Sequence, residues 1–185
     1  MSQDFFIADL HFFDEGILKT RPGFASMSEM KSYLIAKWNT RVGEKDTVWV
    51  LGDFARTKDF DLVADLVESL NGEKVLILGN HDNTDLWQKI KEEGVGNVLD
   101  VIPMYSGVFN ENLFVLNHYP LLVWPKRGGG AMHLYGHVHN QTFKVENMPW
   151  GSCCVSVEMI DYEPKTIPEL MGRLIEKNKE KWIFN

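Results

Sequence analysis

Apolar runs of strand length alternate with amphipathic segments along the first half of the chain. The strand-like runs, rich in Val, Ile, Leu and Phe, lie at 3–8, 47–51 and 74–78, with a further one at 113–117. Segments with helical spacing of apolar residues lie between them, at 26–38, 59–70 and 84–93. Because alternating strands and helices are typical of parallel βαβ units, this half predicts an α/β fold with a parallel sheet.

Local signals mark where these elements begin and turn. Ser26 and Glu29 have the spacing of a capping box, and a second such box at Thr166 predicts the start of a last helix. The segment from about 98 to 157 is strand-rich, with a candidate hairpin turn at 110–112. The second half therefore predicts further sheet rather than more βαβ units.

Composition places the chain among ordinary globular proteins. With 185 residues, 44% hydrophobic and 24% charged, we expect a single domain spanning residues 1–185 with a proper core. No apolar run approaches the ~20 residues that a membrane span needs, and the amino terminus lacks a basic, signal-like segment. Cys153 and Cys154 are adjacent, so they are poorly placed to bond each other. We interpret them as small strand residues rather than zinc ligands, in a reduced, cytoplasmic setting.

The net charge of −7, from 19 Lys and Arg against 26 Asp and Glu, disfavours nucleic acid as a partner. A protein that follows a nucleic-acid backbone needs a basic stripe. We therefore expect no extended nucleic-acid surface. The lack of an apolar run of spanning length separately predicts no membrane partner.

Five of the six histidines lie in short polar motifs, most of them directly after predicted strands. These motifs are DLH at 9–11, GD at 52–53, GNHD at 79–82, NHYP at 117–120 and GHVH at 136–139. The carboxyl ends of parallel strands line one crevice, so the three motifs that follow predicted parallel strands, DLH, GD and GNHD, are predicted to converge there. Within DLH, and again within GHVH, the two outer residues should face the same way if the segment is extended. Carboxylate, amide and imidazole ligands together suit Zn, Mn or Fe(II).

This ordered set of motifs resembles the calcineurin-like metallophosphoesterase superfamily, and most of all its compact bacterial or phage phosphoesterases. The resemblance extends from Asp9 to His139, and five motifs in order are highly specific. It implies an α/β fold of two packed mixed β-sheets flanked by helices, a four-layer sandwich. It also implies two divalent metal ions, Mn, Zn or Fe, that share Asp53 as a bridge. The implied first set is Asp9, His11, Asp53 and His139, and the second is Asp53, Asn80, His118 and His137.

The implied reaction is hydrolysis of a phosphoester by a metal-bridging hydroxide that attacks phosphorus. In the family, the histidine of GNHD contacts the phosphoryl group and protonates the leaving oxygen; here it is His81. Phosphoprotein phosphatases of this superfamily read GDxxDRG, and the later Asp orients that histidine. This chain has Arg56 at the corresponding position, which disfavours the protein-phosphatase interpretation. Either Asp82 orients His81 instead, or no residue does.

Two cations near the motifs are candidates for binding the phosphate of a small substrate. Arg56 follows the GD motif by three residues, and Arg127 lies in a glycine-rich segment before GHVH. The alternative is that these residues, like Arg21 and Lys126, are plain surface charges. His133 lies outside every motif and is either structural or pocket-lining.

Two other functions share these motifs. A non-catalytic scaffold of the same fold would have lost metal ligands, whereas this chain retains every one of them. A nuclease of the double-strand-break repair type usually carries extra DNA-binding parts, and none is evident in this short acidic chain. The favoured substrate is a small phosphomonoester or phosphodiester, between which the motifs do not discriminate.

Overall fold

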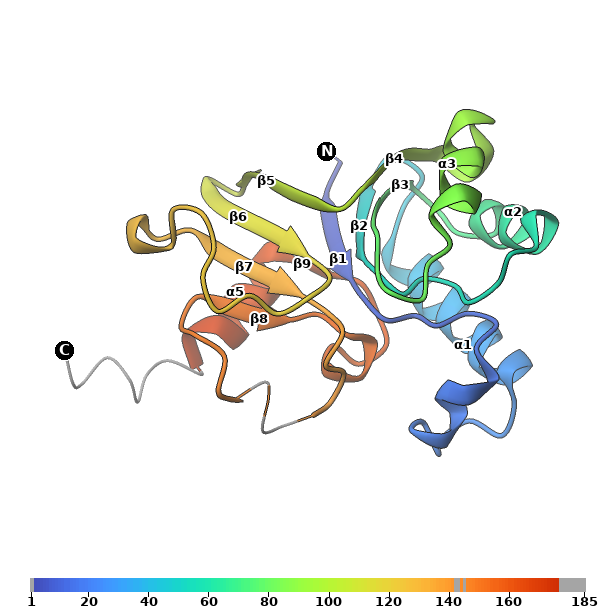
Figure 1. Ribbon diagram of the computed structural model, residues 1–185, viewed down its shortest axis with the longest axis horizontal. Coiled ribbons are helices and arrows are strands. Elements are labelled where there is room, and N and C mark those ends of the chain that lie inside the picture. Colours follow the sequence, from blue (N-terminus) through green and yellow to red (C-terminus); the bar gives the residue numbers. More distant parts are fainter. Residues whose placement is uncertain (1, 142–143, 145, 177–185) are drawn as a thin grey trace.

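The computed structural model describes residues 2–141, 144 and 146–176 and contains two β-sheets (Figure 1). In the first sheet the strands follow the order β4-β3-β2-β1-β9. Its four parallel strands are β1 (Asp4–Ile7), β2 (Thr47–Leu51), β3 (Glu73–Ile77) and β4 (Val98–Ile102). The short strand β9 (Lys165–Thr166) pairs antiparallel with β1.

The second sheet has the order β5-β6-β7-β8. Its strands are β5 (Met104–Phe109), β6 (Asn112–Asn117), β7 (Met132–Tyr135) and β8 (Ser152–Cys154). Only β5 and β6 pair antiparallel; the other pairs are parallel. A parallel bridge between Ala8 and Ser156 links the chain after β1 to the chain after β8, so the two sheets meet just beyond their strand ends.

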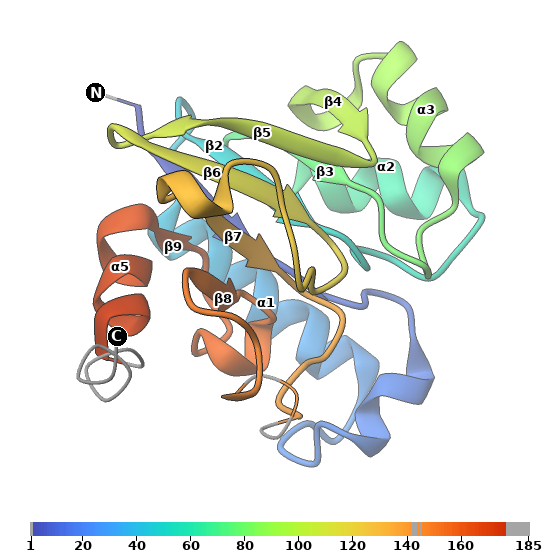
Figure 2. The same ribbon diagram turned by 60° about the vertical axis from the view of Figure 1, so that its left-hand side comes forward.

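Helices cover the sheets from outside, as two views of the ribbon show (Figures 1 and 2). They are α1 (Met27–Arg41), α2 (Phe60–Glu68), α3 (Thr84–Glu92) and α5 (Ile167–Glu176). Four short 3-10 helices complete the described elements: η1 (Glu15–Lys19), η2 (Val95–Asn97), η3 (Arg127–Gly129) and η4 (Val157–Met159). Two mixed sheets with flanking helices confirm the predicted fold class. None of the helices in the described ranges is both long and apolar enough to cross a membrane.

Aromatic side chains join the two sheets. Phe6 on β1 meets Phe109 on β5 edge-on at 5.1 Å between ring centroids, and Trp49 on β2 lies 4.5 Å from Tyr105 on β5. Such pairs add to the large apolar area that each ring buries. This inter-sheet core fixes the position of the strand ends, where the polar motifs lie.

Cap residues set the helix starts close to the predicted positions. The Ser26 hydroxyl accepts from the Glu29 N–H at 3.2 Å, and the Glu29 carboxylate accepts in return from the Ala25 N–H. Asp59 and Asn83 cap α2 and α3 in the same way. The predicted strand at 47–51 matches β2, and the others differ from the structure by one or two residues.

The hairpin predicted at 110–112 is confirmed by β5 and β6, whose last pair is Phe109 with Asn112. The two-residue loop, Asn110 and Glu111, has φ of 47° and 65°. Positive φ at both central residues is the type I′ arrangement, which favours glycine at the second position. Glu111 therefore adopts a conformation that glycine would adopt at lower cost.

We expect Glu111→Gly to raise the free energy of unfolding by about 0.5–1 kcal/mol. The left-handed conformation costs a non-glycine residue about 1–2 kcal/mol, and the extra flexibility of unfolded glycine offsets part of that gain. Urea denaturation measures the change. Glu111→Ala serves as the control, because alanine keeps the positive-φ cost; equal stability of the two variants would contradict this explanation.

Candidate metal centre

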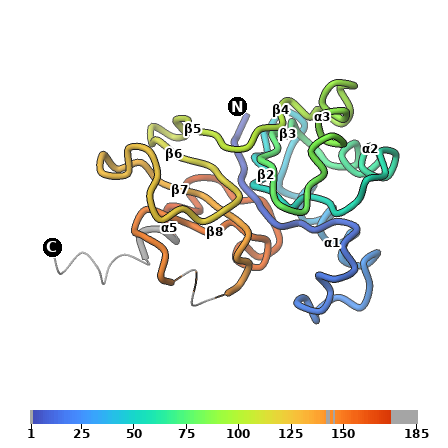
Figure 3. The backbone as a smooth tube through the Cα atoms, in the orientation of Figure 1, coloured from blue at the N-terminus to red at the C-terminus, as the bar shows by residue number. Residues whose placement is uncertain are grey.

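The segment that follows β1 lies against the segment that follows β2. Asp9 N–H donates to the Gly52 carbonyl at 3.0 Å, and His11 N–H donates to the Asp53 carbonyl at 2.9 Å. Figure 3 traces these two backbone segments as they leave the first sheet. The DLH and GD motifs are thus fixed side by side by their own backbones, as the convergence of parallel strand ends requires.

Five candidate ligands have backbone φ in the left-handed region, between 49° and 70°: Asp9, His11, Asp53, His137 and His139. Positive φ is uncommon outside glycine, and such strained positions cluster at functional sites. The expectation of extended motifs with outer residues on one face is therefore wrong. Asp9 and His11 still meet, whereas His137 and His139 point to different ligand groups.

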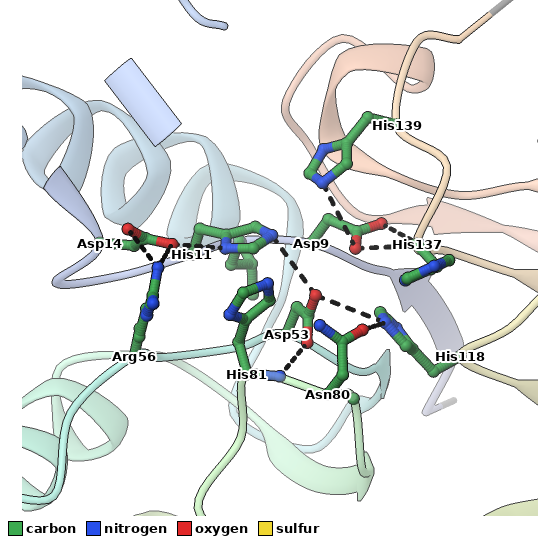
Figure 4. A network of polar contacts seen from close by, with 12 residues as sticks. Asp9, His11, Asp14, Asp53, Arg56, Asn80, His81, His118, His137 and His139 are labelled. Atoms are coloured by element: carbon green, nitrogen blue, oxygen red, sulfur yellow. Dashed lines mark hydrogen bonds and ion pairs between the residues drawn. The ribbon is translucent and has the colours of Figure 1, made fainter. Parts of the chain in front are cut away.

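Six of the candidate ligands form two groups of three. Within each group, the donor atoms all lie within 4.8 Å of one another. The first group is Asp9, His11 and His139, and the second is Asp53, His118 and His137. Figure 4 shows the two groups side by side, with the carboxylate of Asp53 between His11 and His118.

Asp53 lies at the junction of the groups. Its Oδ2 is 3.5 Å from Nε2 of His11 and 3.4 Å from Nε2 of His118. Asn80 joins the second group, because its Oδ1 lies 3.1 Å from the same nitrogen of His118. One carboxylate oxygen thus faces one imidazole from each group, the position that a bridging ligand requires.

In three of the imidazoles, Nδ1 faces an oxygen atom and Nε2 points inward. These pairs are His11 with Asp14 (3.3 Å), His139 with Glu158 (3.0 Å) and His118 with the Leu51 carbonyl (2.9 Å). Metal-binding histidines are usually held in this way. Nε2 of His11 is buried and has no hydrogen-bond partner among the described residues. A metal ion bound there would be the missing partner of this nitrogen.

Burial shapes the charges of the first group. It raises the pKa of Asp9 to about 6, against the lowering effect of His139 and His118. It also lowers the pKa of His11 to about 4, so this imidazole is neutral at pH 7 with a free lone pair. A carboxylate that is costly to ionise and a neutral imidazole are both stabilised by a cation. The residues therefore fit a divalent metal ion.

Asp53 behaves differently from Asp9. Burial alone would raise its pKa, but the hydrogen bond and charge of His118 lower it to about 2. Asp53 is therefore ionised throughout the neutral range. A permanently charged carboxylate between the two groups suits two cations better than one.

The carboxylate of Asp82 binds backbone rather than the ring of His81. It accepts from the N–H groups of Gly79 (2.8 Å), Asp53 (2.8 Å), Phe54 (2.9 Å) and Ala55 (3.4 Å). Both oxygens thus accept from backbone donors, and an orienting role of Asp82 toward His81 stays a prediction. Its role in the structure is to clamp the loop after β2 to the loop after β3.

His81 and Arg56 lie at the edge of the first group (Figure 4). The ring of His81 is 5.2 Å from that of His11, and its backbone N–H donates to Asp53 Oδ1 at 2.9 Å. The side chain of Arg56 is 57% exposed and lies 3.4 Å from Asp14. Each is one contact from a candidate ligand: His81 lies beside His11, and Arg56 lies beside Asp14, which faces His11.

Two other residues singled out in the sequence lie near β7: Arg127 in the loop before the strand and His133 on the strand itself. Arg127 stacks 5.0 Å above the Trp124 ring and donates to the Leu122 carbonyl at 3.4 Å, so its contacts are within its own loop. Its role in phosphate binding stays a prediction. His133 is structural: Nδ1 faces the Val115 carbonyl, and Nε2 accepts from the Leu121 N–H.

No motif in the sequence points to the residues that hold the candidate ligands in position. Arg21, interpreted as a possible surface charge, is 1% exposed. Asp14 and Glu158 orient two ligand imidazoles, and the Ser156 hydroxyl donates to Asp9. Cys153 and Cys154 are buried residues of β8, in keeping with small strand residues.

Glycines in two motifs are required by close packing against the ligands. A Cβ atom on Gly136 would lie 2.6 Å from Oδ2 of Asp9, and one on Gly79 would collide with the carboxylate of Asp53. These glycines let the backbone approach the carboxylates, so the G of GNHD and of GHVH belongs to the site itself.

The family model for calcineurin-like phosphoesterases matches residues 5–147, which include every candidate ligand. The chain belongs to this family. An uncharacterized protein of Methanocaldococcus jannaschii is 35% identical over 184 residues, covering 97% of this chain and 94% of that relative. The Gene 66 protein of Mycobacterium phage L5 is 27% identical over 163 residues, covering 76% of this chain and 79% of the phage protein.

The fold also matches a solved structure. A protein of unknown function from Aquifex aeolicus superimposes with a TM-score of 0.72 at 21% identity, covering 94% of this chain and 100% of that one. At this identity the likeness supports the two-sheet fold alone. Membership of the family supports a phosphoesterase function and the binding of divalent metal at this site.

We expect Asp82→Asn to lower the free energy of unfolding by roughly 2–4 kcal/mol, because hydrogen bonds to a charged acceptor contribute ~1.5–3 kcal/mol each. The amide group of asparagine would also place its own N–H donors against the backbone N–H groups that now point at Asp82. Urea denaturation compares it with Asp65→Asn, which changes an exposed carboxylate on α2. If both variants are equally stable, Asp82 does not clamp the two loops.

Proposed function

We propose that the protein is a dinuclear-metal phosphoesterase that hydrolyses a small phosphomonoester or phosphodiester. The observation that carries this proposal is the position of Asp53, whose Oδ2 faces one imidazole from each of two ligand groups. Divalent ions, when bound, act as Lewis acids and lower the pKa of water, as in other two-metal hydrolases. Their identity, Mn, Zn or Fe, is left open by the mixed oxygen and nitrogen donors.

The chain's own residues provide the binding frame. We assign the first ion to Asp9, His11, Asp53 and His139 and the second to Asp53, Asn80, His118 and His137. Neutral imidazoles preserve the Lewis acidity of the ions, whereas the carboxylates offset part of their charge. All seven positions are occupied by residues able to act as ligands, which supports an enzyme over a scaffold that has lost them.

His81 is the residue best placed to act on the substrate itself. Its ring lies beside His11, and the described residues place no hydrogen-bond partner at the ring. It is therefore free to contact a phosphoryl oxygen or to protonate the leaving group. Arg56, half exposed beside Asp14, provides a guanidinium that suits phosphate geometry.

The substrate is small under this proposal. The net charge of −7 opposes binding along a nucleic-acid backbone, which depends on many basic contacts. Tyr119, 44% exposed, lies 4.8 Å from the ring of His137, and we assign it to the wall that meets the organic part of the substrate. The exposed Leu122 and Val123 follow in the same loop.

We expect Asp53→Asn to abolish hydrolysis of p-nitrophenyl phosphate and bis(p-nitrophenyl) phosphate and to weaken binding of both ions. Chelation should inactivate the wild type, and added Mn²⁺ should restore activity. Elemental analysis of the loaded protein, with Asp65→Asn as control, measures the ion content. Full activity after chelation, or at most one ion bound by the wild type at saturation, contradicts the dinuclear proposal.

We expect His81→Ala to keep the metal content of the wild type and to lower kcat by ~10²–10⁴, the usual contribution of general acid–base assistance. The loss should be smaller for a nitrophenolate leaving group, which departs without a proton, than for an alkoxide. Rate measurements on matched aryl and alkyl phosphates test this. An equal loss for both would assign His81 to phosphate binding alone, and loss of metal would assign it to the ligand set.

A further inference from the structure

A buried arginine connects the first motif of the site to its last. Arg21 lies between η1 and α1 and is 1% exposed. Its guanidinium donates to the backbone carbonyls of Asp9 (2.6 Å) and Leu10 (3.1 Å). The same group forms an ion pair with Glu158, with Nη2 2.7 Å and Nε 2.8 Å from Oε1. Arg21 thus holds the DLH backbone and the Glu158 carboxylate together.

Glu158 receives three donors on a single oxygen. Oε1 accepts both contacts from Arg21 and lies 3.0 Å from Nδ1 of His139. Its side chain is 7% exposed and lies on η4, the short helix after the Ala8–Ser156 bridge between the sheets. The oxygen that faces His139 is therefore fixed by a buried, charged partner rather than by solvent.

His139 depends on this contact more than the other oriented imidazoles do. Its side chain is 20% exposed, whereas those of His11 and His118 are 3% and 0% exposed. Packing alone therefore holds His11 and His118 more firmly than His139. A carboxylate behind an imidazole fixes the direction of the ring and makes it a stronger ligand.

We propose that Glu158, fixed by Arg21, is a positioning residue that sets the metal affinity of the Asp9–His11–His139 group alone. The second group does not share this support, because His118 is oriented by the backbone carbonyl of Leu51. The two metal sites are therefore supported differently, and only the site that contains His139 depends on the side chain of Glu158. This inference rests on the proposed function, since it requires that both groups bind metal.

The test is Mn²⁺ binding to the full chain by isothermal titration calorimetry, with ion content checked by elemental analysis. The wild type should show two classes of site; His139→Ala and His137→Ala identify which class belongs to which group. Glu158→Ala should weaken the His139 class roughly 10–100-fold, the usual effect of removing such a partner. It should leave the other class unchanged.

Glu158→Gln guards against a folding defect. It retains an oxygen for Arg21 and His139 but removes the charge, so its loss should be confined to the same class and smaller than that of Glu158→Ala. Glu163→Gln is the matched control, because Glu163 pairs with Lys37 and Lys165 and touches no ligand. It should bind both ions like the wild type.

The outcomes separate the two proposals. A wild type with fewer than two classes contradicts the dinuclear function itself. A wild type with two classes, together with Glu158 variants that leave both unchanged or weaken both equally, overturns the positioning role alone. If Glu158→Ala does not fold, an unchanged affinity in Glu158→Gln still overturns it.

Discussion

The structure depends on burying carboxylates and imidazoles together where two sheets meet. Asp9, Asp53 and His118 are almost fully buried, and each would be costly there without a partner of opposite charge or a hydrogen bond. Hydrogen bonds from the backbone and from neighbouring side chains offset part of this desolvation free energy. A divalent cation bound in each group would offset the rest. The inter-sheet aromatic core supplies the rigid frame on which this polar cluster is assembled.

The backbone of the motifs shows how the frame serves the ligands. Left-handed φ at five candidate ligands is a strained arrangement that the surrounding structure must maintain. Asp82 contributes by accepting from the N–H groups of two adjacent loops, and Gly79 contributes by allowing Asp53 to approach. Some residues of the motifs thus serve to position neighbouring motif residues.

The convergence of the DLH, GD and GNHD motifs was predictable from sequence, because strand ends in a parallel sheet converge and these motifs follow those ends. NHYP and GHVH follow strands of the second sheet, and only the family resemblance placed them at the site. The hairpin at 110–112 was also predictable, since its turn is local. The orientation within each motif was not, because alternation along an extended strand fails where φ is positive. His137 and His139 consequently separate into different groups.

The supporting residues were not predictable either, because they are brought to the site only by tertiary folding. Glu158 is 19 residues from His139 and 137 from Arg21, and nothing local marks either contact. Arg21 resembles any other surface arginine until the fold buries it. The single-domain organisation stays a prediction.

The most direct test of two metal ions sharing Asp53 is anomalous diffraction from a crystal grown with Mn²⁺. We expect two anomalous peaks roughly 3.5–4 Å apart, a spacing typical of two-metal sites. One should lie against Asp9, His11 and His139, the other against Asn80, His118 and His137, and both within bonding distance of Asp53. A single peak, or two peaks of which only one contacts Asp53, would contradict this expectation.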